Sequence, residues 1–150
     1  MKIIRGSIAA NKKLVKPVSF FEKEMFENGW LRTSRIDFAS AQKYFAVEAN
    51  GEIISFLIFD RHHYLKTGVS ILGAWTKPEY RRHHLYNKLF KYLSDTYRAK
   101  GYDAIISGFH EGNVISRAMQ ENQGREIKEL KDNGFHTTIF YLKKGIRLEH

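Results

Sequence analysis

The sequence has no cysteine among its 150 residues, which excludes disulfide bonds, thiolate nucleophiles and cysteine-ligated metal sites. It has no apolar run approaching the roughly 20 residues of a membrane-spanning helix, and no apolar core of a signal peptide follows Met1. The seven histidines show neither HxxxH nor HExxH spacing, so no metal site is predicted. Together these absences favour a cytoplasmic protein that does not enter a membrane.

What is present indicates one packed domain. Hydrophobic residues make up 43% and aromatic residues 14% of a chain long enough to bury a core. The formal net charge of +9 favours anionic partners, but it does not choose among a phosphorylated cofactor, an acidic substrate, nucleic acid and a membrane surface. Residues 148–150 resemble a vector-derived junction with a tag, so we expect the domain to span residues 1–147.

The basic N-terminal segment could contact nucleic acid. It contains Lys2, Arg5, Lys12, Lys13 and Lys16, but no nucleic-acid-binding motif accompanies these residues. We therefore interpret it as a solvated face, with no nucleic acid among the expected partners.

A helix is predicted after Pro17. Ser19 and Glu22 have the spacing of a capping box, and Asn28-Gly29 supplies a stop. The following segment, Trp30 to Ala41, is ambiguous between a second short helix and a loop.

Strands are predicted on both sides of Asn50-Gly51, a strong hairpin signal. Both flanking runs, KYFAVEA from Lys43 and EIISFLIF from Glu52, are apolar at nearly every position, which is typical of strands in a sheet covered on two faces. Residues Lys2 to Arg5 could add a short edge strand.

A strand–helix–strand unit follows. The strands are Gly68–Thr76 and Asp103–Phe109, and the helix between them ends at Gly101. Its core-facing stripe consists of Leu85, Leu89, Phe90, Leu93 and Tyr97. Connections this short predict parallel strands with a right-handed crossover, and we expect the strands to separate at their carboxyl ends, where a ligand enters.

The rest of the chain completes a mixed sheet. Asn113 caps a helix that ends at Gly124, and a strand is predicted over Glu126–Leu130. A turn at residues 132–134 then leads to a strand over Phe135–Leu142. The predicted fold class is therefore α/β, with a mixed, twisted sheet flanked by helices.

A basic turn joins the strand Gly68–Thr76 to its helix. Arg81, Arg82, His83 and His84 stand where backbone amides and the helix dipole can hold a phosphate. The alternative is a solvated helix start, although positive side chains there oppose the dipole. Tyr86 could stack on an adenine or fill the core.

These features resemble the GNAT superfamily of acyl-CoA-dependent N-acyltransferases over roughly Tyr44 to Leu142. The run Pro78-Glu79-Tyr80-Arg81 matches the family's approach to its pyrophosphate-binding turn, and Asn113 and Gly124 match the next helix's ends. The resemblance implies a GNAT-like fold and acetyl-CoA as co-substrate. The cofactor-binding residues that it implies are Trp75, Thr76, Arg81, Arg82, His83, His84, Leu85, Tyr86 and Asn113.

The chain departs from the family pattern at two places. His84 and Tyr86 occupy positions where the family carries glycine, so a side chain could block close approach of a phosphate. Gln120 occupies the position of a tyrosine that often acts as general acid, and an amide can only hydrogen-bond to the leaving sulfur. His110 and Glu111, after the second parallel strand, are the nearest candidates for a general base, with surface decoration as the alternative; His62 and His63 also lie on a loop.

We therefore expect an N-acetyltransferase that moves an acetyl group from acetyl-CoA to a small-molecule or peptide amine by direct attack. The alternative is an inactive binding module on the same fold, whose basic cleft holds another anion or a protein partner. The sequence leaves the acceptor and the oligomeric state open, a homodimer included.

Overall fold

The computed structural model describes residues 1–30, 36–40, 42–128 and 134–145. By its internal contacts the chain forms two compact units. Unit 1 comprises Met1–Asp60 and Ile71–Leu93, and unit 2 comprises Arg61–Ser70 and Ser94–His150. Two strands and one helix have residues in both units, and each unit is described by itself.

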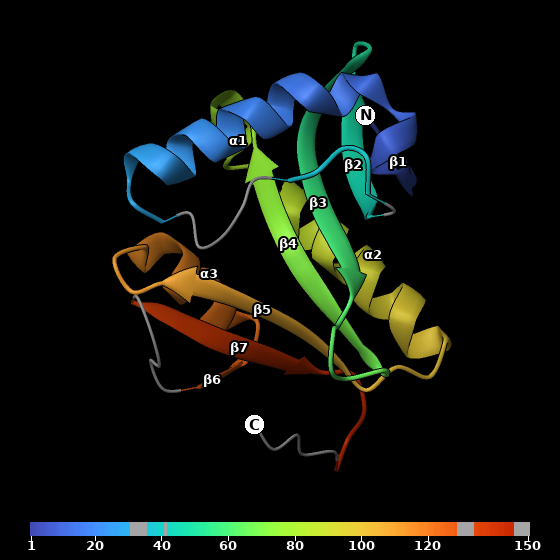
Figure 1. Cartoon of the computed structure of the whole chain (residues 1–150), viewed down its shortest axis with the longest axis vertical. Helices are drawn as coiled ribbons and strands as arrows, with labels where there is room; N and C mark the ends of the chain where they lie inside the picture. Colours follow the sequence, from blue (N-terminus) through green and yellow to red (C-terminus); the bar gives the residue numbers. More distant parts are fainter. Residues whose placement is uncertain (31–35, 41, 129–133, 146–150) are drawn as a thin grey trace. The chain divides into compact units, whose positions relative to one another are not determined.

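The strands are hydrogen-bonded in the order β1-β2-β3-β4-β5-β7-β6 (Figure 1). In the first part of this order the strands are β1 (Lys2–Ser7), β2 (Lys43–Ala49), β3 (Glu52–Arg61) and β4 (Gly68–Thr76). β1 pairs antiparallel with β2 and, within the described residues, is an edge strand, as predicted. The predicted mixed α/β sheet is confirmed.

The hairpin between β2 and β3 is confirmed at the predicted residues. Asn50 and Gly51 both have positive φ, 53° and 75°. Two consecutive left-handed residues are what a tight turn needs to match the twist of its strands. The turn therefore fixes a register in which Ala49 faces Glu52.

The first helix, α1 (Val15–Glu27), begins four residues before the predicted capping residue. The capping-box prediction at Ser19 was wrong, because Ser19 lies inside the helix and Leu14 is the N-cap. Leu14 is fully buried, so packing at this end sets the helix start. Gly29 has φ +71°, which agrees with the predicted stop.

Successive residues of β2 point to opposite faces in unit 1. Tyr44 and Ala46 belong to a core cluster with residues of α1, whereas the Phe45 ring meets Tyr92 of α2 (Leu85–Ala99) edge-on at 4.8 Å. The predicted stripe of α2 is buried, with Leu85, Leu89, Phe90, Leu93 and Tyr97 all at most 6% exposed. β2 and β3 are therefore covered on both faces, as their continuous apolar pattern predicted.

Unit 2 contains β5 (Ala104–His110), α3 (Val114–Asn122), β6 (Glu126–Ile127) and β7 (Phe135–Tyr141). Gly68–Ser70 of β4 pair in parallel with Ala104–Ile106, which confirms the predicted direction of the two strands. β7 pairs antiparallel with β5 along its whole length, and β6 covers part of β7. The predicted separation of β4 from β5 concerns how the two units are placed and stays a prediction.

Some predictions lie outside the described residues. They are part of the segment Trp30–Ala41, the end of the predicted strand at Leu130, most of the turn before Gly134, and the tag at 148–150. No helix among the described ranges is long and apolar enough to cross a membrane.

The start of β5 is held by a carboxylate in unit 2. Asp103 accepts a hydrogen bond from Thr67 Oγ1 at 2.7 Å and lies 3.1 Å from Lys143 Nζ. The Thr67 hydrogen bond, and then the Lys143 contacts, lower the pKa of Asp103 below its ordinary value. A carboxylate with a lowered pKa stabilises the folded state above its ordinary pKa, and this contribution is lost as pH falls through the folded-state pKa.

Replacing the hydroxyl donor tests this arrangement. In Thr67→Val the pKa of Asp103, measured by carboxyl NMR titration, should rise toward its ordinary value, and stability at pH 7 should fall. The difference in unfolding free energy from the wild type should shrink as the pH is lowered below about 4, because the carboxylate is then protonated in both proteins. Lys143→Ala should also raise the pKa, and an unchanged pKa in Thr67→Val would contradict the assignment.

Candidate functional site

The turn between β4 and α2 in unit 1 is built from local backbone hydrogen bonds. A short 3-10 helix, η3 (Pro78–Tyr80), follows β4, and the Tyr80 N–H donates to Lys77 O at 2.8 Å. The His83 N–H then donates to Tyr80 O at 3.1 Å. This closes the turn two residues before α2 begins at Leu85.

His84 occupies the last position before α2 with φ +57°, in the left-handed region. This is one of the two positions where the GNAT pattern carries glycine, and the backbone there has the conformation that glycine favours. A residue with a Cβ pays roughly 1–2 kcal/mol for this conformation. The His84 side chain is exposed, so the conformation is not explained by burial of the ring.

Backbone donors remain open at this helix start. Within the described part of the chain, the N–H groups of Arg82, His84 and Leu85 donate to no other residue. They lie at or just before the positive end of the dipole of a 15-residue helix whose first turn has no acidic side chain. The arrangement suits an anion. The His83 amide, which was predicted to join this set, is already used inside the turn.

The two arginines of the turn differ in their contacts. Arg81 Nε donates to Thr76 O at 2.9 Å, and its Nη2 forms an ion pair with Glu24 Oε2 at 2.8 Å, so this side chain joins the turn to β4 and α1. Arg82 is exposed and has no side-chain partner among the described residues. Of the two predicted phosphate ligands, Arg82 is the one whose charge is not already engaged.

The aromatic rings near the turn pack against the protein. The Tyr86 ring stacks on Phe90 at 6.2 Å along α2, and the His83 ring lies 5.9 Å from that of Tyr80. Trp75 is 8% exposed and belongs to the core cluster, with its ring stacked on Phe56 at 6.1 Å. Thr76 Oγ1 shares a hydrogen bond with buried Ser55 at 2.8 Å. The side chains of Trp75 and Thr76 are thus structural, and only their backbone groups remain candidates for a cofactor contact.

The second set of predicted residues follows β5 in unit 2. His110 Nδ1 accepts a hydrogen bond from the Gly112 N–H at 3.0 Å, and its ring meets Phe135 edge-on at 5.0 Å. When Nδ1 accepts, the neutral ring carries its proton on Nε2, which makes it a donor rather than a base. The Glu111 carboxylate is exposed and has no partner among the described residues.

Asn113 and Gln120 hold α3 in place. Asn113 is the N-cap of α3, where its side-chain oxygen accepts from the Ser116 N–H at 3.1 Å. Gln120 is 2% exposed, and its Oε1 accepts from Thr138 Oγ1 at 2.7 Å and from Arg125 Nη1 at 3.2 Å. Its Nε2 donates to Ser116 Oγ at 2.9 Å. Contact of Gln120 with a leaving thiolate would require one of these bonds to break.

Unit 1 also contains a pocket that the sequence interpretation missed. It encloses about 570 Å³ and is lined by α1, by the β2–β3 hairpin and by the residues after β4. Lys16, Phe20 and Glu24, spaced by four on one face of α1, all line it. The spacing by four places these three residues on one side of the helix and is the sequence feature that could have indicated the pocket. From the sequence alone we instead interpret Lys16 as part of a solvated face.

Comparisons with known proteins bear on the fold and family. The model of the acetyltransferase (GNAT) family matches residues 13–124, more than half of the chain. No curated protein matches the chain. An N-acetyltransferase from Staphylococcus aureus Mu50 superposes with a TM-score of 0.71 at 13% identity, covering 95% of this chain and 100% of its own.

Two further solved structures contain a coenzyme. YncA from Salmonella typhimurium, with acetyl-CoA, has a TM-score of 0.69 at 13% identity and covers 99% of both chains. The PaiA N-acetyltransferase from Thermoplasma acidophilum, in complex with coenzyme A, has a TM-score of 0.71 at 14% identity and covers 94% of this chain and 99% of its own. At such identities these likenesses show the shared fold.

Glycine at position 84 should relieve the strained backbone. We expect His84→Gly to raise the free energy of unfolding by about 1 kcal/mol, because the left-handed conformation then carries no Cβ penalty. Chemical denaturation of the variant and the wild type measures this difference. The control is His84→Ala, which removes the imidazole but keeps a Cβ, and which should not be stabilised. Equal stabilisation of both variants would assign the effect to the imidazole instead.

Proposed function

This chain belongs to the GNAT family of acetyltransferases. We propose that it transfers an acetyl group from acetyl-CoA to an amine. The observation that carries this proposal is the set of N–H groups at the start of α2 that have no acceptor among the described residues, in the same turn as Arg82, whose guanidinium has no partner there either. Solved relatives of the same fold contain acetyl-CoA or coenzyme A.

The pyrophosphate of coenzyme A is proposed to bind the turn from Arg82 to Tyr86. The amides of His84 and Leu85 would donate to it, and Arg82 would supply a charge-assisted contact. The left-handed backbone at His84 supports this assignment, because it gives the turn the course that a glycine would give.

The chemistry follows from positioning the two substrates. The acceptor nitrogen attacks the thioester carbonyl carbon, the C–S bond breaks, the amine gives up a proton and the thiolate leaving group gains one. We propose that backbone groups at Trp75 and Thr76 orient the carbonyl and that Asn113 contacts the pantetheine arm. No covalent intermediate on the enzyme is needed, in keeping with a chain that lacks cysteine.

Proton transfer is assigned to the residues that follow β5. Glu111 offers a carboxylate with no partner in the part of the chain that the structure describes, and it can accept the amine proton directly or through water. His110, with its hydrogen on Nε2, is suited to donate a hydrogen bond to the leaving thiolate, which then takes its proton from water. Gln120 is proposed to hold Ser116 and Thr138 so that the end of β5 keeps its place. The acceptor is a small-molecule or peptide amine.

Coenzyme A binding tests the proposal. At a ligand concentration of roughly 100 times Kd the free energy of unfolding should rise by about 2.7 kcal/mol, measured as a thermal shift. Arg82→Ala should weaken binding about tenfold, because one charge-assisted contact is lost. The matched control is Lys23→Ala, which removes one exposed positive charge of α1, where Lys23 pairs with Glu27 at 4.0 Å.

Measuring turnover distinguishes the N-acetyltransferase hypothesis from that of an inactive binding module. Release of free thiol from acetyl-CoA in the presence of a panel of amines should be observed, and Glu111→Gln should lower kcat more than it changes the Kd for coenzyme A. The absence of a thermal shift with millimolar coenzyme A would overturn the proposal in favour of the binding module.

A further inference from the structure

The pocket of unit 1 has an apolar floor. Phe20 and Trp75 form one wall, with ring centroids 6.1 Å apart and planes tilted by 32°, and buried Ile53 closes the base. Phe20 is 47% exposed, an unusual state for a phenylalanine beside the core. A volume of about 570 Å³ is in the range of small-molecule sites, so the pocket can take a flat apolar group against these rings.

The carboxylates at the rim of this pocket are already paired. Glu24 forms its ion pair with Arg81 at 2.8 Å. Glu52 and Glu79 both contact Lys77, at 3.0 and 3.6 Å. A cationic ligand would therefore have to displace a resident ion pair to gain a partner of its own.

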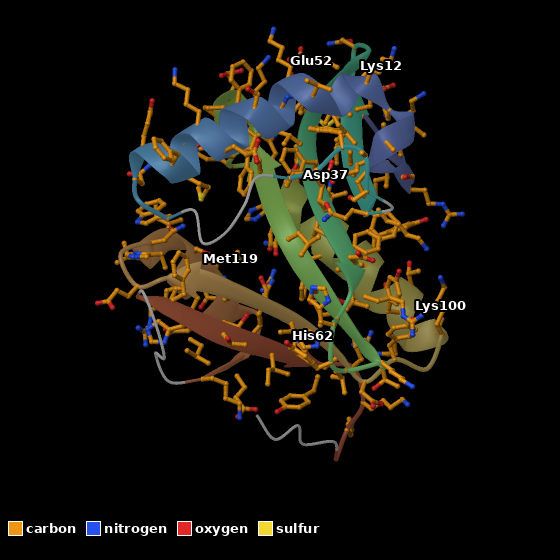
Figure 2. All side chains as sticks on the ribbon, viewed as in Figure 1. Lys12, Asp37, Glu52, His62, Lys100 and Met119 are labelled. Carbon is orange, nitrogen blue, oxygen red and sulfur yellow. The ribbon has the colours of Figure 1, made fainter. Side chains whose placement is uncertain are left out.

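Two lysines at the rim have no such anionic partner among the described residues. Lys12 has no side-chain contact, and Lys16 only places its Nζ over the Phe20 ring, 5.8 Å from the centroid. Figure 2 labels Lys12 and Glu52, which both line this pocket. The helix that carries Lys16 has no acidic residue in its first turn and no side-chain cap, so its positive end adds to the same field.

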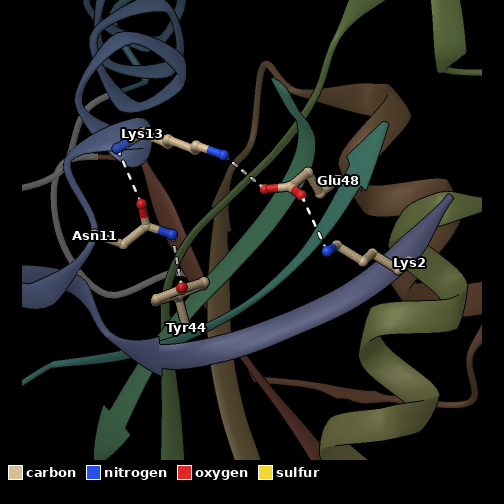
Figure 3. A network of polar contacts seen from close by, with 5 residues as sticks. All are labelled: Lys2, Asn11, Lys13, Tyr44 and Glu48. Atoms are coloured by element: carbon tan, nitrogen blue, oxygen red, sulfur yellow. Dashed lines mark hydrogen bonds and ion pairs between the residues drawn. The ribbon is translucent and has the colours of Figure 1, made fainter. Parts of the chain in front are cut away.

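The segment that carries Lys12 is fixed by its neighbours (Figure 3). Asn11 donates to the Tyr44 hydroxyl at 2.8 Å and accepts from the Lys13 N–H at 3.0 Å. Lys13 Nζ lies 3.3 Å from Glu48, which Lys2 also contacts at 3.5 Å. Glu48 of β2 thus compensates the charge of Lys13. The pocket lysines without an anionic partner among the described residues are Lys12 and Lys16.

We infer that this pocket binds a small carboxylate with a flat apolar body, the body lying on Phe20 and Trp75 and the carboxylate between the ammonium groups of Lys12 and Lys16. Such a ligand buries the exposed phenyl ring and neutralises two cations that have no anionic partner within the described ranges. The same chemistry could belong to an acyl acceptor that also bears an amine, or to an effector that bears none. The inference stands apart from coenzyme A binding at the turn.

The indole N–H signals of the two tryptophans give a direct readout. In a 15N-labelled sample of the full chain, 2-naphthoate should shift the Trp75 indole signal in a saturable way and leave that of Trp30 in place, with Trp30→Phe assigning the two. The double variant Lys12→Ala/Lys16→Ala should weaken naphthoate binding about five- to tenfold, because each exposed ion pair contributes modestly. Phe20→Ala should weaken it similarly, and Lys23→Ala should not.

Two further probes, one uncharged and one positively charged, test whether the carboxylate of naphthoate matters. 2-Naphthylmethanol should bind several-fold more weakly than naphthoate, and 2-naphthylmethylammonium more weakly still. Equal binding of naphthoate to the lysine double variant, tighter binding of the ammonium probe, or no saturable shift would overturn the inference. Displacement of naphthoate by coenzyme A would also overturn it, because the pocket would then belong to the coenzyme site.

Activity measurements distinguish whether the ligand of this pocket is an acyl acceptor or an effector. The ligand would be identified as the acceptor if the protein acetylates phenylalanine but not phenylalanine amide, and if the rate with phenylalanine is lower in Lys12→Ala/Lys16→Ala. A change in the rate with another amine upon addition of naphthoate, without competition, would identify an effector. Both results support the carboxylate site, and the coenzyme A thermal shift reports separately on the proposed function.

Discussion

The central constraint in unit 1 is the passage from a closed turn into a buried helix within two residues. The hydrogen bond from His83 to Tyr80 ends the turn, and Leu85, only 3% exposed, must already face the core as the first residue of α2. His84 is the single residue between them, and its left-handed backbone makes the change of direction. The burial of the α2 stripe offsets this local strain. The same geometry leaves peptide N–H groups without an acceptor among the described residues, so the packing of α2 and the open donors at its start have one origin.

The parts of the fold that local rules govern could be predicted from the sequence. Asn50-Gly51 specifies a two-residue hairpin because few other residues adopt two left-handed conformations in succession. The i+4 recurrence from Leu85 to Tyr97 defines the buried side of α2 without reference to the rest of the chain. The start of α1 could not be found in this way: Ser19 and Glu22 have the spacing of a cap, but the burial of Leu14 and Val18 extends the helix past them. Tertiary packing overrides a local signal there.

The candidate site shows the same division. The position of the turn and the cap at Asn113 follow from short patterns and are where the sequence places them. Which contacts an individual side chain makes depends on residues that are distant in the sequence. Arg81 is engaged by Glu24, 57 positions away, and Gln120 is surrounded by Ser116, Thr138 and Arg125. A single sequence carries no marker for such pairings, so it could not tell Arg81 from Arg82.

The outermost strand β1 has a bearing on how the protein behaves at high concentration. Its pairing with β2 leaves its other side without a strand among the described residues, and such a row of peptide groups is a template for intermolecular association. Lys2 and Arg5 project from this strand as exposed cations, and Gly6 adds a residue with little tendency to extend a ladder. Two copies approaching side by side would bring like charges together. Exposed charge on this edge, together with Gly6, is therefore what opposes such pairing among the described residues.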